Sequence, residues 1–190
     1  MIVHTERLIL QEVQPADVAE VHALNLLPET DRYNTLGIPA HISETEALVA
    51  DWVAQRELHP QGSYVFSIRL RDSGVFVGNI GLKLGPARYR RGEVWYKVHV
   101  LHWGKGYATE ALRAVLHFAF VTLHLHRVEA GCAVENKASA AVLLKAGMIR
   151  EGGKRKVLPI RGQWVDNDEY AILEEEYFDQ QINGYEHHND

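Results

Sequence analysis

The sequence predicts a mixed α/β domain whose central sheet carries helices on its faces. The main observation is the order of the segments, because β-prone runs come first and then alternate as strand, helix, strand, helix and strand. The second is a glycine-containing turn at residues 104–106 that joins a β-prone run directly to the longest helical pattern. The length of 190 residues and an apolar content of 46% fit one domain with one sizeable core. We expect the domain to cover residues 1–179 and a polar tail to cover residues 180–190.

The predicted strands are short runs in which apolar and polar residues alternate, or in which β-branched and aromatic residues predominate. The turn at residues 71–74 joins two of them as a hairpin, and residues 86–92 and 162–168 have the composition of turns. The strands are expected over residues 8–13, 64–70, 76–84, 93–100, 127–134, 148–157 and 170–177.

The predicted helices show apolar residues three and four positions apart, with start and stop signals at their ends. Asp17 is expected near the start of the first helix and Pro28 at its end, and Ser43 with Glu46 forms a capping box for the second. Residues 29–42 between these helices are polar and turn-rich, which predicts a loop beside the active site. The later helices are expected over residues 43–58, 107–123 and 137–146.

Composition excludes several classes of protein. A net charge of −5 argues against general binding of nucleic acid, which needs a basic surface. The single cysteine, Cys132, cannot form an internal disulfide bond, which suits a reducing compartment. No apolar run reaches the length of a membrane span, and the N-terminus does not have the pattern of a signal peptide. We therefore expect a cytoplasmic protein with no membrane or nucleic-acid partner.

The segment WGKGYATEA at residues 103–111 is the most informative part of the chain. Glycine permits a positive φ and a close approach of the backbone to a ligand. Successive N–H groups at the start of a helix then form a site for a phosphate or pyrophosphate. The segment has neither the third glycine of a dinucleotide fingerprint nor a Ser or Thr after Lys105, so NAD and ATP are not the expected ligands.

A second segment, NKAS at residues 136–139, opens the helix that stops at Gly147. With both segments in this order, the chain resembles the GNAT superfamily of acetyl-CoA-dependent N-acetyltransferases, and most closely its ribosomal-protein N-terminal (alanine/serine) acetyltransferase branch. TERLIL at residues 5–10 and EVWYKV at residues 93–98 are similar to the first and fourth strands of that branch. The resemblance extends to about Phe178. It implies a twisted, mostly antiparallel sheet of about seven strands, with the fourth and fifth strands splayed apart.

The resemblance also implies a binding site for the co-substrate acetyl-CoA. The pyrophosphate would lie on the glycine turn, and the pantetheine arm would bond to the backbone of the fourth strand. Leu101 departs from the family pattern, which has Gln or Arg at that position, so a polar contact must come from elsewhere or be absent. Asn136 and Lys145 each have an alternative to donor binding. The alternative for Asn136 is an N-cap role, and the alternative for Lys145 is a place on a solvated helix face. The candidate donor-binding residues are Val98, Val100, Trp103, Gly104, Lys105, Gly106, Tyr107, Ala108, Thr109, Asn136, Ser139 and Lys145.

The candidate catalytic residues are Glu93 and Ser139. By resemblance, Glu93 would be a general base acting through water and Ser139 would protonate the departing thiolate. The alternative for Glu93 is a solvated carboxylate at the strand edge that pairs with Arg90 or Arg91. The alternative for Ser139 is a hydroxyl in the first turn of a helix capped by Asn136, with no catalytic role. Tyr33 and Trp164 lie in segments whose counterparts in relatives border the acceptor site. The histidines form no ligand cluster at helical spacing, so no metal is expected.

The sequence therefore predicts an enzyme that acetylates a primary amine by direct attack, with no acetyl-enzyme intermediate. A peptide or protein N-terminal α-amine is the favoured acceptor by branch resemblance. A small-molecule amine (a polyamine, an aminoglycoside or an amino-acid derivative) is the alternative acceptor, and a non-catalytic acetyl-CoA sensor is the alternative from another class. The protein is expected to act as a monomer or homodimer.

Overall fold

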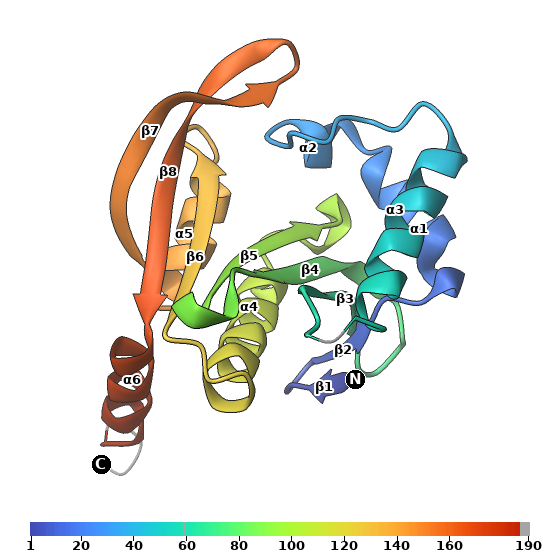
Figure 1. Ribbon diagram of the computed structural model, residues 1–190. Coiled ribbons are helices and arrows are strands. Elements are labelled where there is room, and N and C mark those ends of the chain that lie inside the picture. Colours follow the sequence, from blue (N-terminus) through green and yellow to red (C-terminus); the bar gives the residue numbers. More distant parts are fainter. Residues whose placement is uncertain (59, 187–190) are drawn as a thin grey trace.

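One open sheet connects the two halves of the molecule (Figure 1). The structure, a computed structural model, describes residues 1–58 and 60–186, and within these residues the sheet has 8 strands in the order β1-β2-β3-β4-β5-β6-β8-β7. The strands are β1 (Ile2–His4), β2 (Leu8–Glu12), β3 (Ser63–Leu70), β4 (Phe76–Leu84), β5 (Arg91–Val98), β6 (Arg127–Ala133), β7 (Ile149–Ile160) and β8 (Gln163–Leu173). The helices are α1 (Val18–Asn25), α2 (Pro28–Asp31), α3 (Ile42–Gln55), α4 (Tyr107–His117), α5 (Lys137–Lys145) and α6 (Glu174–Glu186).

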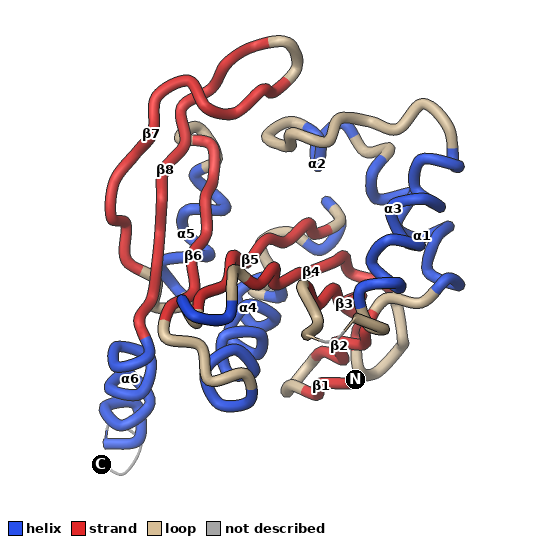
Figure 2. Tube along the Cα trace, viewed as in Figure 1, coloured by secondary structure: helices blue, strands red, loops and turns tan. Residues whose placement is uncertain are grey.

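The sheet opens between β5 and β6. These strands are parallel, whereas the other neighbouring pairs are antiparallel, and they pair only where Arg91–Glu93 faces Arg127–Glu129. In the described part of the chain, residues 94–98 of β5 have no β6 partner, and Figure 2 shows the two strands separating beyond their contact. The mixed fold is confirmed. The expected splay is also confirmed, because the predicted fourth and fifth strands are β5 and β6.

Alternation along β5 assigns its side chains to the two faces of the sheet. Val94 and Val98 are buried in the main core with the apolar stripe of α4 and with Leu143 of α5. Trp95 points to the opposite face, where its ring centroid lies 5.6 Å from that of Trp52 in α3. One face of β5 is therefore filled by α4 and α5, and the other faces α1 and α3.

Three predicted boundaries in the N-terminal half and at the end of β5 are wrong. The first helix ends before Pro28, as predicted, but Pro28 also begins α2, which occupies the start of the expected loop, because proline is tolerated at the first helical position, where no N–H donor is needed. The capping box at α3 uses His41 and Glu44 instead of Ser43 and Glu46, since the chain is still extended at His41. The strand expected over residues 93–100 ends at Val98, because residues 100–102 form a 3₁₀ turn closed by a bond from Trp103 N to Val100 O.

The C-terminal segment differs most from the prediction. Residues 162–168, expected as a turn, belong mostly to β8, which pairs with β7 around a turn at Arg161 and Gly162. The expected strand over residues 170–177 ends at Leu173, and α6 follows. Three glutamates at the start of α6 favour a helix, because negative charge near a helix N-terminus interacts with its dipole. Residues 187–190 of the predicted tail lie outside the described residues, and the domain limits stay a prediction.

Candidate active site

The glycine turn leads directly into α4. Gly104 has a φ of +73° and Gly106 a φ of +81°, and Gly106 is the N-cap of the helix. At Gly104 an added Cβ would meet no atom within 4 Å, so the backbone is open on that side. The N–H groups of Tyr107, Ala108 and Thr109 belong to the first turn, where no carbonyl of the helix can accept from them. These features fit the binding of a pyrophosphate, as the sequence predicts.

Arg7, which the sequence pattern indicates only as part of a strand, braces this turn. Its Nη1 donates to the carbonyl of Lys105 at 3.0 Å, and its Nε donates to Glu110 Oε2 at 2.7 Å. The guanidinium also lies 4.8 Å from the centroid of the Tyr107 ring. Burial acts to raise the pKa of Glu110, but hydrogen bonds from Thr5 and Arg7 outweigh it and lower that pKa. A local pattern could not have shown a contact between segments so far apart in the chain.

The structure modifies the predicted backbone contacts of the donor. The indole Nε1 of Trp103 donates to the carbonyl of Val98 at 2.7 Å, so this carbonyl already has a partner. Val100 lies in the 3₁₀ turn and not in the strand. The backbone that β6 leaves unpaired is at residues 94–98, and of these residues the Val98 carbonyl is bonded to Trp103. Lys145, at the end of α5, is exposed, and its ammonium donates no hydrogen bond within the described residues.

Ser139 and Asn136 occupy the first turn of α5, beside this open edge. Asn136 Oδ1 accepts from the N–H of Ser139 at 3.1 Å, so the N-cap interpretation of Asn136 is confirmed. The hydroxyl oxygen of Ser139 lies 2.8 Å from the phenol oxygen of Tyr96, which also donates to the Ser139 carbonyl at 3.1 Å. Burial raises the pKa of Tyr96, against the opposing effect of the Ser139 hydrogen bond. The Tyr96 phenol therefore stays protonated at neutral pH.

Glu93 does not share a face of the sheet with Ser139. It is exposed on β5, opposite Lys83 of β4, on the same side as Trp95 and Lys97. The pairing with Arg90 or Arg91 that was the alternative for Glu93 does not form, because Arg90 binds Glu174 and Arg91 lies 4.0 Å from Glu129. Within the described residues, no cation lies within 4.0 Å of the Glu93 carboxylate. Glu93 and Ser139 thus flank β5 from its two sides.

The segments that contain Tyr33 and Trp164, the two predicted acceptor-site residues, lie close together. Trp164 is 62% exposed near the start of β8, and Tyr33 is half-buried just after α2. Arg161, in the turn between β7 and β8, connects their segments. Its Nε donates to Asp31 Oδ2 at 3.0 Å, and its Nη2 donates to the Pro28 carbonyl at 2.9 Å. The hairpin and α2 therefore come together on the α1 side of the sheet (Figure 1).

Lys97 of β5 is a polar residue of this side that the sequence reasoning missed. It is half-buried, and its Nζ donates to Asn25 Oδ1 at 2.7 Å. Burial lowers the pKa of Lys97 to about 8, partly opposed by attraction to Asp31. A lysine inside an otherwise apolar and aromatic strand pattern, as in VWYKV, was the available indication.

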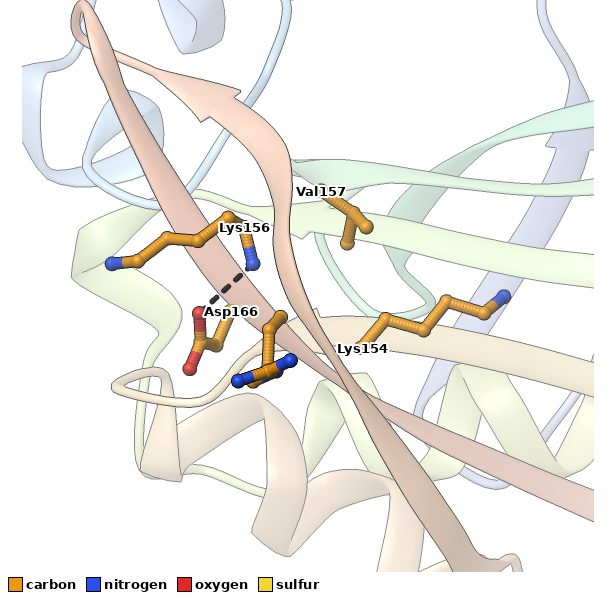
Figure 3. A pocket seen from close by; sticks show the side chains of 5 residues that line it. Lys154, Lys156, Val157 and Asp166 are labelled. Carbon is orange, nitrogen blue, oxygen red and sulfur yellow. Dashed lines mark hydrogen bonds between the residues drawn. The ribbon is translucent and has the colours of Figure 1, made fainter.

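Two cavities lie away from the glycine turn. A cavity of about 160 Å³ lies against Asn25, between α1, α3 and the loop at residues 36–39. The other, of about 590 Å³, is on the β7–β8 hairpin and is lined by Lys154, Arg155, Lys156, Val157 and Asp166 (Figure 3). There the strand pairing is irregular and Lys156 N donates to Asp166 Oδ1 at 2.9 Å. In the described part of the chain, no three His, Cys, Asp or Glu side chains are grouped to hold a metal.

Three features indicate the class of protein: the open edge of β5, the glycine turn before α4, and the paired hydroxyl groups of Ser139 and Tyr96. Together they are typical of an α/β transferase of the kind that uses a coenzyme A thioester. Comparison with known proteins then identifies the family. The chain belongs to the acetyltransferase (GNAT) domain family, whose model matches residues 7–149. It is an N-acetyltransferase. Among the described helices, none combines the length and the apolar composition that a membrane span requires.

Two relatives in sequence and one solved structure with a similar fold are compared with the chain. The chain is 30% identical over 176 residues to the uncharacterized N-acetyltransferase YoaA of Bacillus subtilis, covering 90% of this chain and 96% of YoaA. It is 28% identical to the ribosomal protein uS5-alanine N-acetyltransferase of Escherichia coli, over 65% of this chain and 67% of that protein. The fold is also similar, with a TM-score of 0.81 and 22% identity, to spermidine N-acetyltransferase from Vibrio cholerae in complex with CoA and spermine, covering 92% and 99% of the two chains.

Proposed function

We propose that the protein transfers an acetyl group from acetyl-CoA to the α-amine of a peptide or protein N-terminus, by direct attack while both substrates are bound. The observation that carries the proposal is the open edge of β5, which has the glycine turn at its end and the Ser139–Tyr96 pair on one side. An acyl donor held on the turn by its pyrophosphate would lie along residues 94–98. The choice of a peptide acceptor rests on similarity to the ribosomal-protein enzyme.

The chemistry needs a neutral amine and a proton for the departing thiolate. An α-amine has a reference pKa of about 8, so a modest base acting through water is sufficient, and Glu93 is the candidate. Ser139 is the candidate donor of the proton to the thiolate. Holding the amine and the thioester in line supplies much of the rate. No residue has to carry the acetyl group, because a thioester is already an activated donor.

A small-molecule amine is the second candidate acceptor, because a structure with the same fold is of a spermidine acetyltransferase. At 22% identity that similarity concerns the fold alone. The deciding experiment measures release of the CoA thiol with peptides that begin with Ala or Ser, with spermidine, with an aminoglycoside and with free amino acids. We expect the highest kcat/KM for a peptide. A higher kcat/KM for spermidine would reject the peptide acceptor, and binding of acetyl-CoA without turnover of any amine would indicate a sensor.

A further inference from the structure

Lys97 lies next to the reacting end of the proposed donor site. Tyr96, which holds Ser139 at 2.8 Å, immediately precedes it in β5, so their Cα atoms are about 3.8 Å apart. The side chains point to opposite faces, Tyr96 toward α5 and Lys97 toward α1. An acyl group at the level of Tyr96 would thus have the hydroxyl pair on one side of the strand and the lysine on the other.

An acceptor amine has to approach from the Lys97 side. The other face of β5 is filled, with Val94 3% and Val98 8% exposed in the main core. On the Lys97 side, Glu93 is exposed and Trp95 and Lys97 are half-buried. This face is also bordered by α2 and by the β7–β8 turn, which Arg161 and Asp31 join.

The Lys97 ammonium has no bonded carboxylate among the described residues. It donates one hydrogen bond, to the neutral amide of Asn25, and in the described part of the chain no carboxylate lies within 4.0 Å of it. Asp31 attracts Lys97 but is itself bound by Arg161. Arg161 neutralises Asp31. Glu93 lies four residues before Lys97 on the same face of β5, so Lys97 acts through the position of its own ammonium and not through a net charge of the face. Because an ammonium has three donors, Lys97 keeps donors available for an oxygen atom of a bound molecule.

We propose that Lys97 determines acceptor specificity by donating to an oxygen atom beside the reacting amine, and so selects a peptide or amino acid over a polyamine. This inference rests on the proposed function and refines it. The first carbonyl of a peptide and the carboxylate of a free amino acid both place such an oxygen next to an α-amine. Spermidine has no oxygen and would bring a second ammonium toward Lys97, which like-charge repulsion disfavours.

The test measures kcat and KM separately for an Ala-initiated peptide, free alanine and spermidine, in the wild type and in Lys97→Met, Lys97→Gln and Lys97→Arg. We expect Lys97→Met and Lys97→Gln to lower kcat/KM for the peptide by about 10- to 100-fold, mainly through KM, because a hydrogen bond from a charged donor is lost. The kcat/KM for spermidine should rise in the same variants. Lys97→Arg, which keeps the charge, should keep the order of preference.

Lys156→Met is the matched control, since it removes the same charge from the hairpin and should not change the preference. Thermal unfolding identifies any variant that fails to fold. If either Lys97→Met or Lys97→Gln fails to fold, the other variant provides the test. An equal loss on peptide and spermidine, or no change on either, would overturn the specificity role. The wild type could prefer free alanine to the peptide, and Lys97→Met could lose this preference. That result would support the role of Lys97 and reject the peptide acceptor. No thiol release with any amine would reject the proposed function and the specificity role with it.

Discussion

The phenol oxygen of Tyr96 lies 2.8 Å from the hydroxyl oxygen of Ser139, and this contact connects β5 to the first turn of α5. It sits beside the stretch of β5 that β6 leaves unpaired. The contact holds the Ser139 hydroxyl beside residues 94–98 of β5, where the proposed acyl donor would lie. A hydroxyl held there by a protonated phenol can pass a proton to a leaving thiolate.

Ser139→Ala should therefore lower kcat by about 10²- to 10⁴-fold while the Kd for acetyl-CoA stays nearly unchanged. Tyr96→Phe should cause a smaller loss of kcat, because the hydroxyl remains but loses its partner. The cap should survive in both, since Asn136 accepts from the backbone of Ser139. Stopped-flow rates and calorimetric titration separate the two effects. An unchanged kcat in Ser139→Ala would leave this residue with a structural role only.

Binding of acetyl-CoA should depend more on Gly106 than on the Lys105 side chain. At Gly106 any side chain is strained by the φ of +81°, and its Cβ would lie 3.3 Å from Arg7 Nη2. Gly106→Leu should weaken binding at least about 10-fold, and Lys105→Ala much less. Gly104→Ala, strained but free of contacts, should fall between them. Comparable losses in Gly106→Leu and Lys105→Ala would show that the lysine charge is the anchor.

The Arg7–Glu110 pair should make stability depend on pH. Because the folded pKa of Glu110 lies below its ordinary value of 4.5, its contribution is present above pH 4.5 and is lost as the pH falls through the lower folded value. Glu110→Gln should reduce the free energy of unfolding by about 1–3 kcal/mol at neutral pH. Urea unfolding of both proteins at about pH 7 and about pH 3.5 checks this, since the difference should shrink in acid. A difference independent of pH would contradict the ionic origin.

Glu93→Gln should lower kcat by about 10²-fold or more if the carboxylate acts as the base. The loss should be smaller at high pH, where the free amine is already deprotonated. Glu46→Gln, an exposed position on α3, is the matched control and should behave as the wild type. Equal kcat values for both variants and the wild type would leave Glu93 as a solvated strand-edge residue.

Direct transfer predicts that both substrates bind before any product leaves. Double-reciprocal plots with both substrates varied should intersect, and EDTA should not abolish activity. Burial raises the pKa of Cys132 to about 11, so its thiol is protonated at neutral pH and is a poor nucleophile. Cys132→Ala should retain activity. Parallel lines, with an acetyl group trapped on Cys132 or Ser139, would overturn the mechanism.

Much of the fold and of the donor site follows from local sequence patterns. Strands β2 to β6 and helices α4 and α5 were predicted because alternation and helical periodicity are properties of neighbouring residues. The positive φ at Gly104 and Gly106 and the Asn136 cap are local in the same sense, since glycine and an N-cap side chain act within a few residues. The family could be recognised for this reason, because its motifs are short and lie in one order along the chain.

The tertiary structure alone decided the features that depend on distant segments. Polar residues at the start of β8 look like a turn until β7 pairs with them, and Val100 looks like strand until the chain turns before Trp103. Arg7 reaches Lys105, and Lys97 reaches Asn25, only because separate strands and helices pack together. The sequence by itself determined the class of enzyme and the backbone that suits the donor. Which charges border the face of β5 that carries Lys97 was decided by packing, because side chains from β5, α1, α2 and the β7–β8 turn meet there only in the folded chain.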